Sequence, residues 1–282
     1  MAAVTAKSEP EVRLEIAAPG LVDIGANLTH SSFEHDFAAV ITEAQAAGVQ
    51  HILLTGTDLK TSQASFNFTQ RDQQLFSSTA GFHPHVAQQV TAGHLAAIEK
   101  LVAKDRVVAV GETGLDFNRN FSEPDSQLAV FEAHLQIASK VSKPLFLHQR
   151  EAHKPFFERL SSYRKELVGG VVHCFTDSRS ALRDYLDLDM HIGITGWICD
   201  ERRGKDLQDI VSYIPQERLL IETDAPYLLP RTLRPKPKSR RNEPKYLTEV
   251  LRILAECRGE DVNKLAAATA INARRLFALP SP

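Results

Sequence analysis

Eight short apolar runs recur along this chain, and most are separated by segments with the spacing of amphipathic helices. Because the runs are almost continuously apolar rather than alternating, they are typical of parallel strands buried on both faces. Repeated strand–helix pairs of this kind predict an α/β fold, here a (β/α)8 TIM-like barrel in a single domain. The predicted strands are residues 21–24, 51–55, 75–80, 107–110, 144–147, 170–172, 190–194 and 219–221.

An open, doubly wound sheet is the alternative to the barrel. That fold is marked by a glycine-rich nucleotide-binding turn after the first strand, and the GETG and GITG segments have too few glycines in the right places. One helix can be placed in more detail, because Ser122 and Asp125 stand where they can cap its start. Its apolar stripe comprises Leu128, Phe131, Leu135 and Ala138.

The chain has 282 residues, which suits one barrel because roughly 200 to 250 residues is routine for this fold. We expect residues 20–282 to form the barrel and residues 1–19 to be a flexible N-terminal leader, since this segment has no hydrophobic signal core and carries several acidic residues. The three cysteines have no metal-type spacing, which predicts reduced thiols and a cytoplasmic protein. No apolar stretch approaches the roughly 20 residues needed to cross a bilayer.

Four of the apolar runs end in a side chain that can bind a metal ion. They end at Glu112, His148, His173 and Asp224. The carboxyl ends of barrel strands meet at one rim, so we expect these four side chains to surround one divalent cation. Two imidazoles and two carboxylates suit zinc, manganese or magnesium alike. Any one of them alone would more often be structural or cap a helix, and the prediction depends on the four together.

A cation at this rim would favour hydrolysis, because it lowers the pKa of a bound water and neutralises charge on a phosphoryl or carbonyl oxygen. Asp224 is expected to accept the proton of that water. The GFHPH segment follows the third predicted strand, which places His83 on the same rim, where it can contact a phosphate oxygen or the leaving group. A rigid turn around Pro84 is the alternative. His85 lies just beyond, whereas His51 and His134 are expected to be structural.

The segment 231–245, RTLRPKPKSRRNEPK, contains seven basic residues, one acidic residue and three prolines. With a formal net charge of only −2, the chain has no general attraction for nucleic acid, so any polyanion site must be local. This segment follows the eighth predicted strand and should lie at the rim, where it would give a salt-dependent affinity for a phosphate backbone. The residues 200–204, DERRG, are expected to add to it. A solvated surface loop is the alternative.

Taken together, these stretches resemble the TatD family of metal-dependent deoxyribonucleases, most closely the TatD branch. The motifs span about residues 21–277 and include DIGANLTHSSF, GFHPH, GETGLDFNRNFS, LFLHQREAH, HCFTDS, GITGWICDERRG, LLIETDAPYLLP and SRRNEP. The resemblance implies a barrel that hydrolyses phosphodiester bonds with a divalent metal, usually Mg²⁺, and acts as a 3′–5′ exonuclease on single-stranded DNA and, in some members, RNA. The implied metal ligands are Glu112, His148, His173 and Asp224.

By the same resemblance, His83 faces the substrate phosphate and is catalytic together with Glu112 and Asp224. Substrate contacts are expected from Asn27, His85, Arg150, Arg240 and Arg241. Many relatives carry a His-x-His pair after the first strand, and this chain has Gly25 and Asn27 there. We therefore expect one of two metal positions to be weak, or to be filled only when substrate phosphate supplies ligands.

Two other functions are alternatives to the nuclease. A small-molecule hydrolase of the kind found among related barrels often uses a modified lysine after the fourth strand, but Glu112 stands there, and the basic segment would have no purpose. A non-catalytic nucleic-acid-binding barrel would be expected to have lost some of the four ligands. The protein is expected to be a monomer without an obligatory protein partner.

Overall fold

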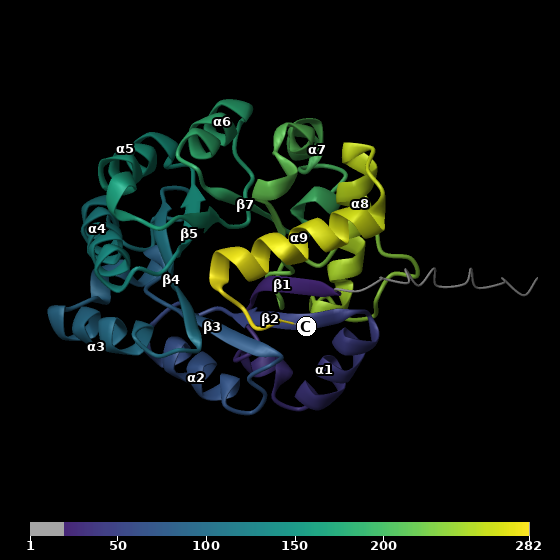
Figure 1. Ribbon diagram of the computed structural model, residues 1–282, viewed down its shortest axis with the longest axis horizontal. Helices are drawn as coiled ribbons and strands as arrows, with labels where there is room; N and C mark the ends of the chain where they lie inside the picture. Colours follow the sequence, from purple (N-terminus) through teal and green to yellow (C-terminus); the bar gives the residue numbers. More distant parts are fainter. Residues whose placement is uncertain (1–19, 282) are drawn as a thin grey trace, which may run out of the picture.

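A computed structural model describes residues 20–281, and the predicted leader, residues 1–19, lies outside the described residues. Eight parallel strands form one sheet in the order of the sequence, and helices surround it (Figure 1), which confirms the predicted (β/α)8 barrel. The strands are β1 Leu21–Ala26, β2 Val49–Leu54, β3 Phe76–Ala80, β4 Val107–Asp116, β5 Leu145–Arg150, β6 Gly170–Val172, β7 His191–Ile194 and β8 Leu219–Ile221.

An α-helix separates each strand from the next, and two helices follow β8. They are α1 Phe37–Ala46, α2 Leu59–Thr69, α3 Ala92–Val102, α4 Pro124–Val141, α5 His153–Tyr163, α6 Arg179–Asp187, α7 Lys205–Ile210, α8 Leu247–Arg258 and α9 Val262–Phe277. Short 3₁₀ helices are η1 Ser31–Phe33, η2 Pro84–Gln89, η3 Arg164–Glu166, η4 Gly196–Cys199, η5 Val211–Tyr213, η6 Gln216–Arg218 and η7 Pro244–Tyr246. None of the helices among residues 20–281 is long and apolar enough to cross a membrane.

The first and last strands meet at their carboxyl ends. Ala26 and Ala225 form a parallel bridge, and the backbone N–H of Asn27 donates to the carbonyl oxygen of Ala225 at 2.6 Å. The N–H of Asp224 donates to the carbonyl oxygen of Gly25 at 2.8 Å. Closure of the barrel therefore places Asn27 and Asp224, which come from opposite ends of the chain, side by side at the predicted rim.

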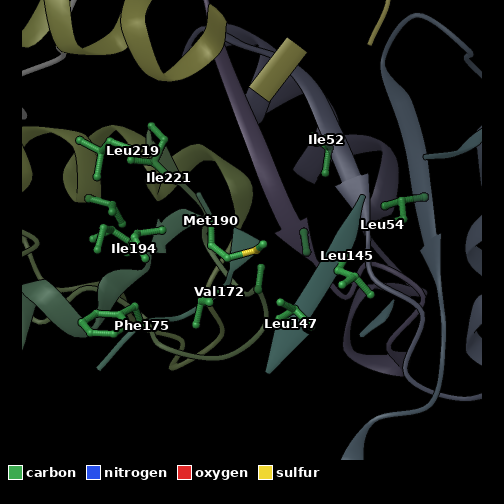
Figure 2. Packing of buried hydrophobic residues seen from close by; sticks show 14 of the residues in the cluster. Ile52, Leu54, Leu145, Leu147, Val172, Phe175, Met190, Ile194, Leu219 and Ile221 are labelled. Carbon is green, nitrogen blue, oxygen red and sulfur yellow. The ribbon is translucent and has the colours of Figure 1, made fainter. Parts of the chain in front are cut away.

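Two apolar layers hold the barrel together, because successive strand residues point to opposite faces. Ile52 and Leu54 of β2, like Leu145 and Leu147 of β5, belong to the large cluster beneath the surrounding helices (Figure 2). The residues between them point inward, and α9 adds side chains to this second cluster, consistent with its packing against β1 and β8. The inner cluster includes Leu53, Phe146, Leu220, Ala270, Ala273 and Phe277.

Strands β4 and β5 are longer than the predicted ranges 107–110 and 144–147, because each continues beyond its apolar run. Glu112 and His148 therefore lie inside strands. The pairing of β4 with β5 shifts register between Val110 and Thr113, an irregularity that redirects side chains along a strand. Gly111 and Gly114 flank Glu112, have φ near +143°, and would bring a Cβ within 2.1 Å and 1.9 Å of β5 carbonyl oxygens. Glycine at these two positions allows the strands to approach.

The predicted apolar stripe of α4 packs against the core, but the predicted capping by Ser122 is wrong. Glu123 is the N-cap and makes no side-chain capping bond, while Asp125 lies in the first turn. Instead, the hydroxyl of Ser122 donates to the carbonyl oxygen of His85 at 3.0 Å and accepts from the N–H of Gln88 at 3.1 Å. Ser122 thus fastens the loop after β4 to the GFHPH segment.

His134 of α4 holds the same segment from within the core, as a structural residue. Its Nδ1 donates to the carbonyl oxygen of Val130 at 2.7 Å, and its Nε2 accepts the N–H of Phe82 at 3.1 Å. Only the neutral imidazole can accept, and burial lowers the pKa of His134 from 6.5 to about 4. His134 therefore stabilises the fold above pH 6.5, and this contribution is lost as the pH falls towards 4.

We expect His134→Gln to unfold with a weaker pH dependence than the natural protein. Between pH 7 and pH 5, the free energy of unfolding of the natural protein should fall by about 2 kcal/mol more than that of the variant. Urea denaturation of both proteins at the two pH values measures the difference. Parallel losses in the two proteins would show that His134 is not the group that titrates.

Candidate active site

The structure gathers the predicted site residues at the carboxyl end of the barrel. Glu112 and His148 lie on β4 and β5. His173 directly follows β6, and His83 and Asp224 come three residues after the ends of β3 and β8. All five line one cleft of about 570 Å³, together with Asn27, His85 and Arg150. Residues far apart in the sequence thus line a single cleft.

Glu112 lies at the centre of this cluster, because its Oε1 is approached by three imidazoles. Nε2 of His173 lies at 2.8 Å, Nδ1 of His148 at 2.9 Å and Nε2 of His83 at 3.3 Å. The ligand atoms of His83, Glu112 and His148 all lie within 4.8 Å of one another. Nitrogen and carboxylate donors that converge in this way fit a divalent cation.

The titration behaviour of the cluster follows from its charges. Burial alone would raise the pKa of Glu112, but the facing His173 and His83 hold it well below its usual range. Burial opposes protonation of His173, yet the carboxylates of Glu112 and Glu222 raise its pKa well above the ordinary value. The pKa of His148 is raised by Asp116 and Glu112 against the same desolvation. Protons on His148 and His173 thus balance the buried negative charge of Glu112. A bound cation would balance the same charge.

Asp224 is placed differently from the other three predicted ligands. Its Oδ1 accepts a hydrogen bond from Nδ2 of Asn27 at 3.1 Å, and it faces His173 and Glu112 across the cleft. Burial raises the pKa of Asp224 to about 8, and the neighbouring Glu112 adds to this, while His173 opposes it. The compact ligand group therefore contains His83, which was predicted only to face phosphate, while Asp224 borders it.

Glu222 is a buried site residue that the sequence analysis missed. Its Oε1 accepts the N–H of Cys174 at 2.6 Å, and its Oε2 lies 3.4 Å from Nδ1 of His173. A Cβ on Gly25 would come within 2.5 Å of Oε2, so this carboxylate occupies the space of a side chain at that position. Gly25 stands where many relatives have the first histidine of the His-x-His pair, and a side chain at this position would collide with Glu222. The signal in the sequence was a second carboxylate two residues before Asp224.

Asp116 is a second missed carboxylate, and it is almost fully buried. Its Oδ2 lies 2.7 Å from Nε2 of His85 and 3.4 Å from Nε2 of His148. Its Oδ1 accepts the N–H groups of Asn118 and Arg119 at 3.0 and 2.9 Å. Although burial works against ionisation, His148, His85 and these N–H groups hold the pKa of Asp116 far below its ordinary value. Asp116 therefore orients two of the site's imidazoles.

The basic segment 231–245 is only partly available to a substrate. Arg241 pairs with Asp36 at 2.6 Å and with Glu243 at 2.8 Å, donates to the carbonyl oxygen of Ser32, and packs over the ring of Phe33. These contacts favour a structural role over the predicted substrate contact. Arg240, in contrast, is exposed. Of the predicted arginines, Arg150 is the one that lines the cleft.

We expect the neighbouring variants Arg240→Ala and Arg241→Ala to differ. Arg241→Ala should lower the free energy of unfolding by about 1–2 kcal/mol, because it breaks half-buried paired contacts. Arg240→Ala should leave stability within about 0.5 kcal/mol and flatten the salt dependence of oligonucleotide binding. Urea denaturation and fluorescence anisotropy at several salt concentrations measure the two effects. If Arg241→Ala instead flattened the salt dependence of binding and left stability unchanged, Arg241 would be assigned to substrate binding.

Known proteins with this sequence pattern are similar to the chain over almost its whole length. The sequence model of the family described as TatD related DNase matches residues 22–278. The "3'-5' ssDNA/RNA exonuclease TatD" of Citrobacter rodentium is 51% identical over 259 residues, 92% of this chain and 98% of the relative. The protein of that name from Salmonella typhimurium is 50% identical over 257 residues, 91% of this chain and 98% of the relative. A TatD homologue structure from Escherichia coli has a TM-score of 0.83 at 27% identity, covering 92% of this chain and 98% of that one. The chain belongs to the family of TatD-related DNases.

Proposed function

We propose that this protein is a metal-dependent exonuclease that removes nucleotides from the 3′ end of single-stranded DNA and of RNA. The observation that carries the proposal is the convergence of His83, His148 and His173 on one oxygen of Glu112 within an open cleft. The names and the near-complete coverage of the relatives support the polarity and the substrate.

Glu112, His148 and His173 would hold the cation, with Asp224 completing the set. His83 belongs to the same compact group as Glu112 and His148, but its role here would be to contact the substrate. Magnesium is the proposed metal, and manganese or zinc would suit the imidazoles as well. When bound, a divalent cation lowers the pKa of a water and neutralises charge on the phosphoryl oxygens. Glu222 fills the space beside Gly25, which supports one resident cation rather than two.

The chain's own residues would divide the remaining work. With a cation bound, which favours the ionised carboxylate, Asp224 would take the proton of the water that attacks phosphorus while the bond from phosphorus to the 3′ oxygen breaks; its Oδ1 is held by the amide of Asn27. Nε2 of His83 would contact a phosphate oxygen, since it lies 3.3 Å from Glu112 and His83 lines the cleft. Asp116 keeps His85 and His148 oriented. A single strand can enter the cleft end first, whereas a duplex has to be opened.

Two finer expectations belong with this proposal. The protein acts in the cytoplasm, a reducing compartment, which agrees with Cys174, Cys199 and Cys257 all being free thiols. A monomer is proposed as the state in which it acts.

A digestion series with 5′-labelled oligomers tests the proposal. Single-stranded DNA, duplex DNA and RNA are incubated with the protein in Mg²⁺, Mn²⁺, Zn²⁺ or a chelator. We expect ladders that shorten from the 3′ end on single strands, slow digestion of the duplex, and no product in the chelator. Internal cuts, shortening from the 5′ end, or undiminished digestion in the chelator would contradict the proposal.

A further inference from the structure

Two exposed aromatic side chains stand at the mouth of the cleft. Large hydrophobic side chains among residues 20–281 are mostly covered, yet Phe121 is 63% exposed and Tyr227 is 53% exposed. Both line the cleft that contains Glu112. Exposure of an aromatic ring to water is unfavourable in free energy, and a flat ligand that covered these rings would bury their apolar surface.

The two rings lie on opposite sides of the opening. Phe121 belongs to the segment between β4 and α4, and Tyr227 to the segment between β8 and α8. Because the eight strands follow one another in order around the barrel, β4 and β8 face each other across it. A strand that enters the cleft along the barrel axis therefore passes between the rings.

Each ring is held in place by neighbours on the rim. Phe121 packs edge to face against His85, with ring centroids 4.8 Å apart, and His85 is in turn bound to Asp116. The adjacent Ser122 is tied to the carbonyl oxygen of His85. Tyr227 contacts His30 at 6.1 Å in the same edge-to-face manner, and its N–H donates to the carbonyl oxygen of Asp224 at 2.9 Å. Such rings are platforms fixed before a ligand binds.

Positive charge accompanies the rings. Arg119 and Arg150 line the same cleft. The third aromatic residue of the cleft, Trp197, is itself covered by guanidinium groups, with that of Arg203 at 4.3 Å and that of Arg150 at 6.0 Å from the ring centroid. Trp197 therefore positions arginines, while Phe121 and Tyr227 keep their faces open. Flat aromatic platforms interleaved with arginines are suited to the bases and phosphates of a single strand.

We propose that Phe121 and Tyr227 form a base-stacking subsite for the last nucleotides at the 3′ end, while Arg119 and Arg150 bind the adjoining phosphates. The inference rests on the proposed nuclease function and names the part of the substrate that the site recognises. Stacking engages the faces of the bases, which all four bases share, so the subsite accepts DNA and RNA without sequence preference. Bases in a duplex are stacked on one another, so the subsite excludes a closed duplex end.

The test combines Phe121→Ala and Tyr227→Ala with a change in the substrate. One oligodeoxynucleotide has ordinary nucleotides throughout, and a second has abasic residues at its last two 3′ positions. On the ordinary oligomer, each variant should lose roughly 5- to 100-fold in kcat/KM, the range for one stacked base. On the abasic oligomer, which the natural protein should already digest slowly, the variants should match the natural protein. Phe121→Trp should retain activity on the ordinary oligomer.

Tyr213→Ala is the matched control, because Tyr213 is a 51% exposed aromatic residue away from the cleft, beside Arg179. It should behave as the natural protein on both substrates. Unchanged kcat/KM in Phe121→Ala and Tyr227→Ala, or an equal loss on both oligomers, would overturn the subsite.

Anisotropy with the same two labelled oligomers, measured in a chelator, gives a readout that needs no turnover. A natural protein that digests nothing would contradict the proposed function. In that event, tighter binding of the ordinary oligomer that Phe121→Ala and Tyr227→Ala abolish would still support the subsite. Equal binding of the two oligomers would overturn it.

Discussion

Glu112→Gln is expected to reduce hydrolysis by roughly 10³-fold or more, because loss of the charge of this proposed metal ligand would remove several kcal/mol of transition-state stabilisation. Glutamine has nearly the same size as glutamate, so the barrel should remain folded. It carries no charge, however, and can no longer attract a cation or balance His83, His148 and His173. Release of labelled mononucleotide in saturating Mg²⁺, compared with the natural protein, measures the loss.

Glu123→Gln is the matched control, since Glu123 is exposed and its side chain makes no capping bond. The control should keep full activity, and both variants should unfold cooperatively. Near-normal digestion by Glu112→Gln would mean that the three imidazoles gather around this carboxylate for structural reasons alone.

Asp224→Asn should have the second largest effect, a fall in kcat of about 10²- to 10⁴-fold with little change in KM. The amide keeps the shape of the carboxylate and can still interact with Asn27. It cannot accept a proton at neutral pH, so the loss should fall on the chemical step rather than on binding. Steady-state kinetics over a range of oligonucleotide concentrations separates the two parameters.

The exposed Asp187, at the end of α6, offers the same chemical change away from the cleft, and Asp187→Asn should match the natural protein. A rise in KM at unchanged kcat in Asp224→Asn would instead assign Asp224 to substrate binding. Full activity would remove it from the site altogether.

Much of the fold was predictable, because burial on both faces makes parallel strands readable as apolar runs. All eight runs correspond to strands, and β6 and β8 have the predicted bounds. The extensions of β4 to Asp116 and β5 to Arg150 were not predictable in this way. Their polar residues face the cleft rather than the core, so the apolar signal ends while the hydrogen-bonded pairing continues.

The proposed ligands could be chosen from the sequence because each stands at the end of an apolar run. Cleft residues whose position depends on neighbours from other parts of the chain could not be found in this way. Glu222 was overlooked because its space is defined by the absent side chain of Gly25, from the other end of the chain. A basic segment in the sequence does not have to be available to a substrate. Arg241 is paired with Asp36, and the two residues come together only in the folded barrel. Nothing in the sequence around Phe121 and Tyr227 indicates that their rings are exposed rather than buried.

Binding of Mn²⁺ to the metal-stripped protein tests the central claim most directly. Calorimetric titration should show one cation per chain, displaced by excess Mg²⁺, with binding lost in Glu112→Gln and retained in Glu123→Gln. No saturable binding by the natural protein, or equal binding by Glu112→Gln, would contradict the account.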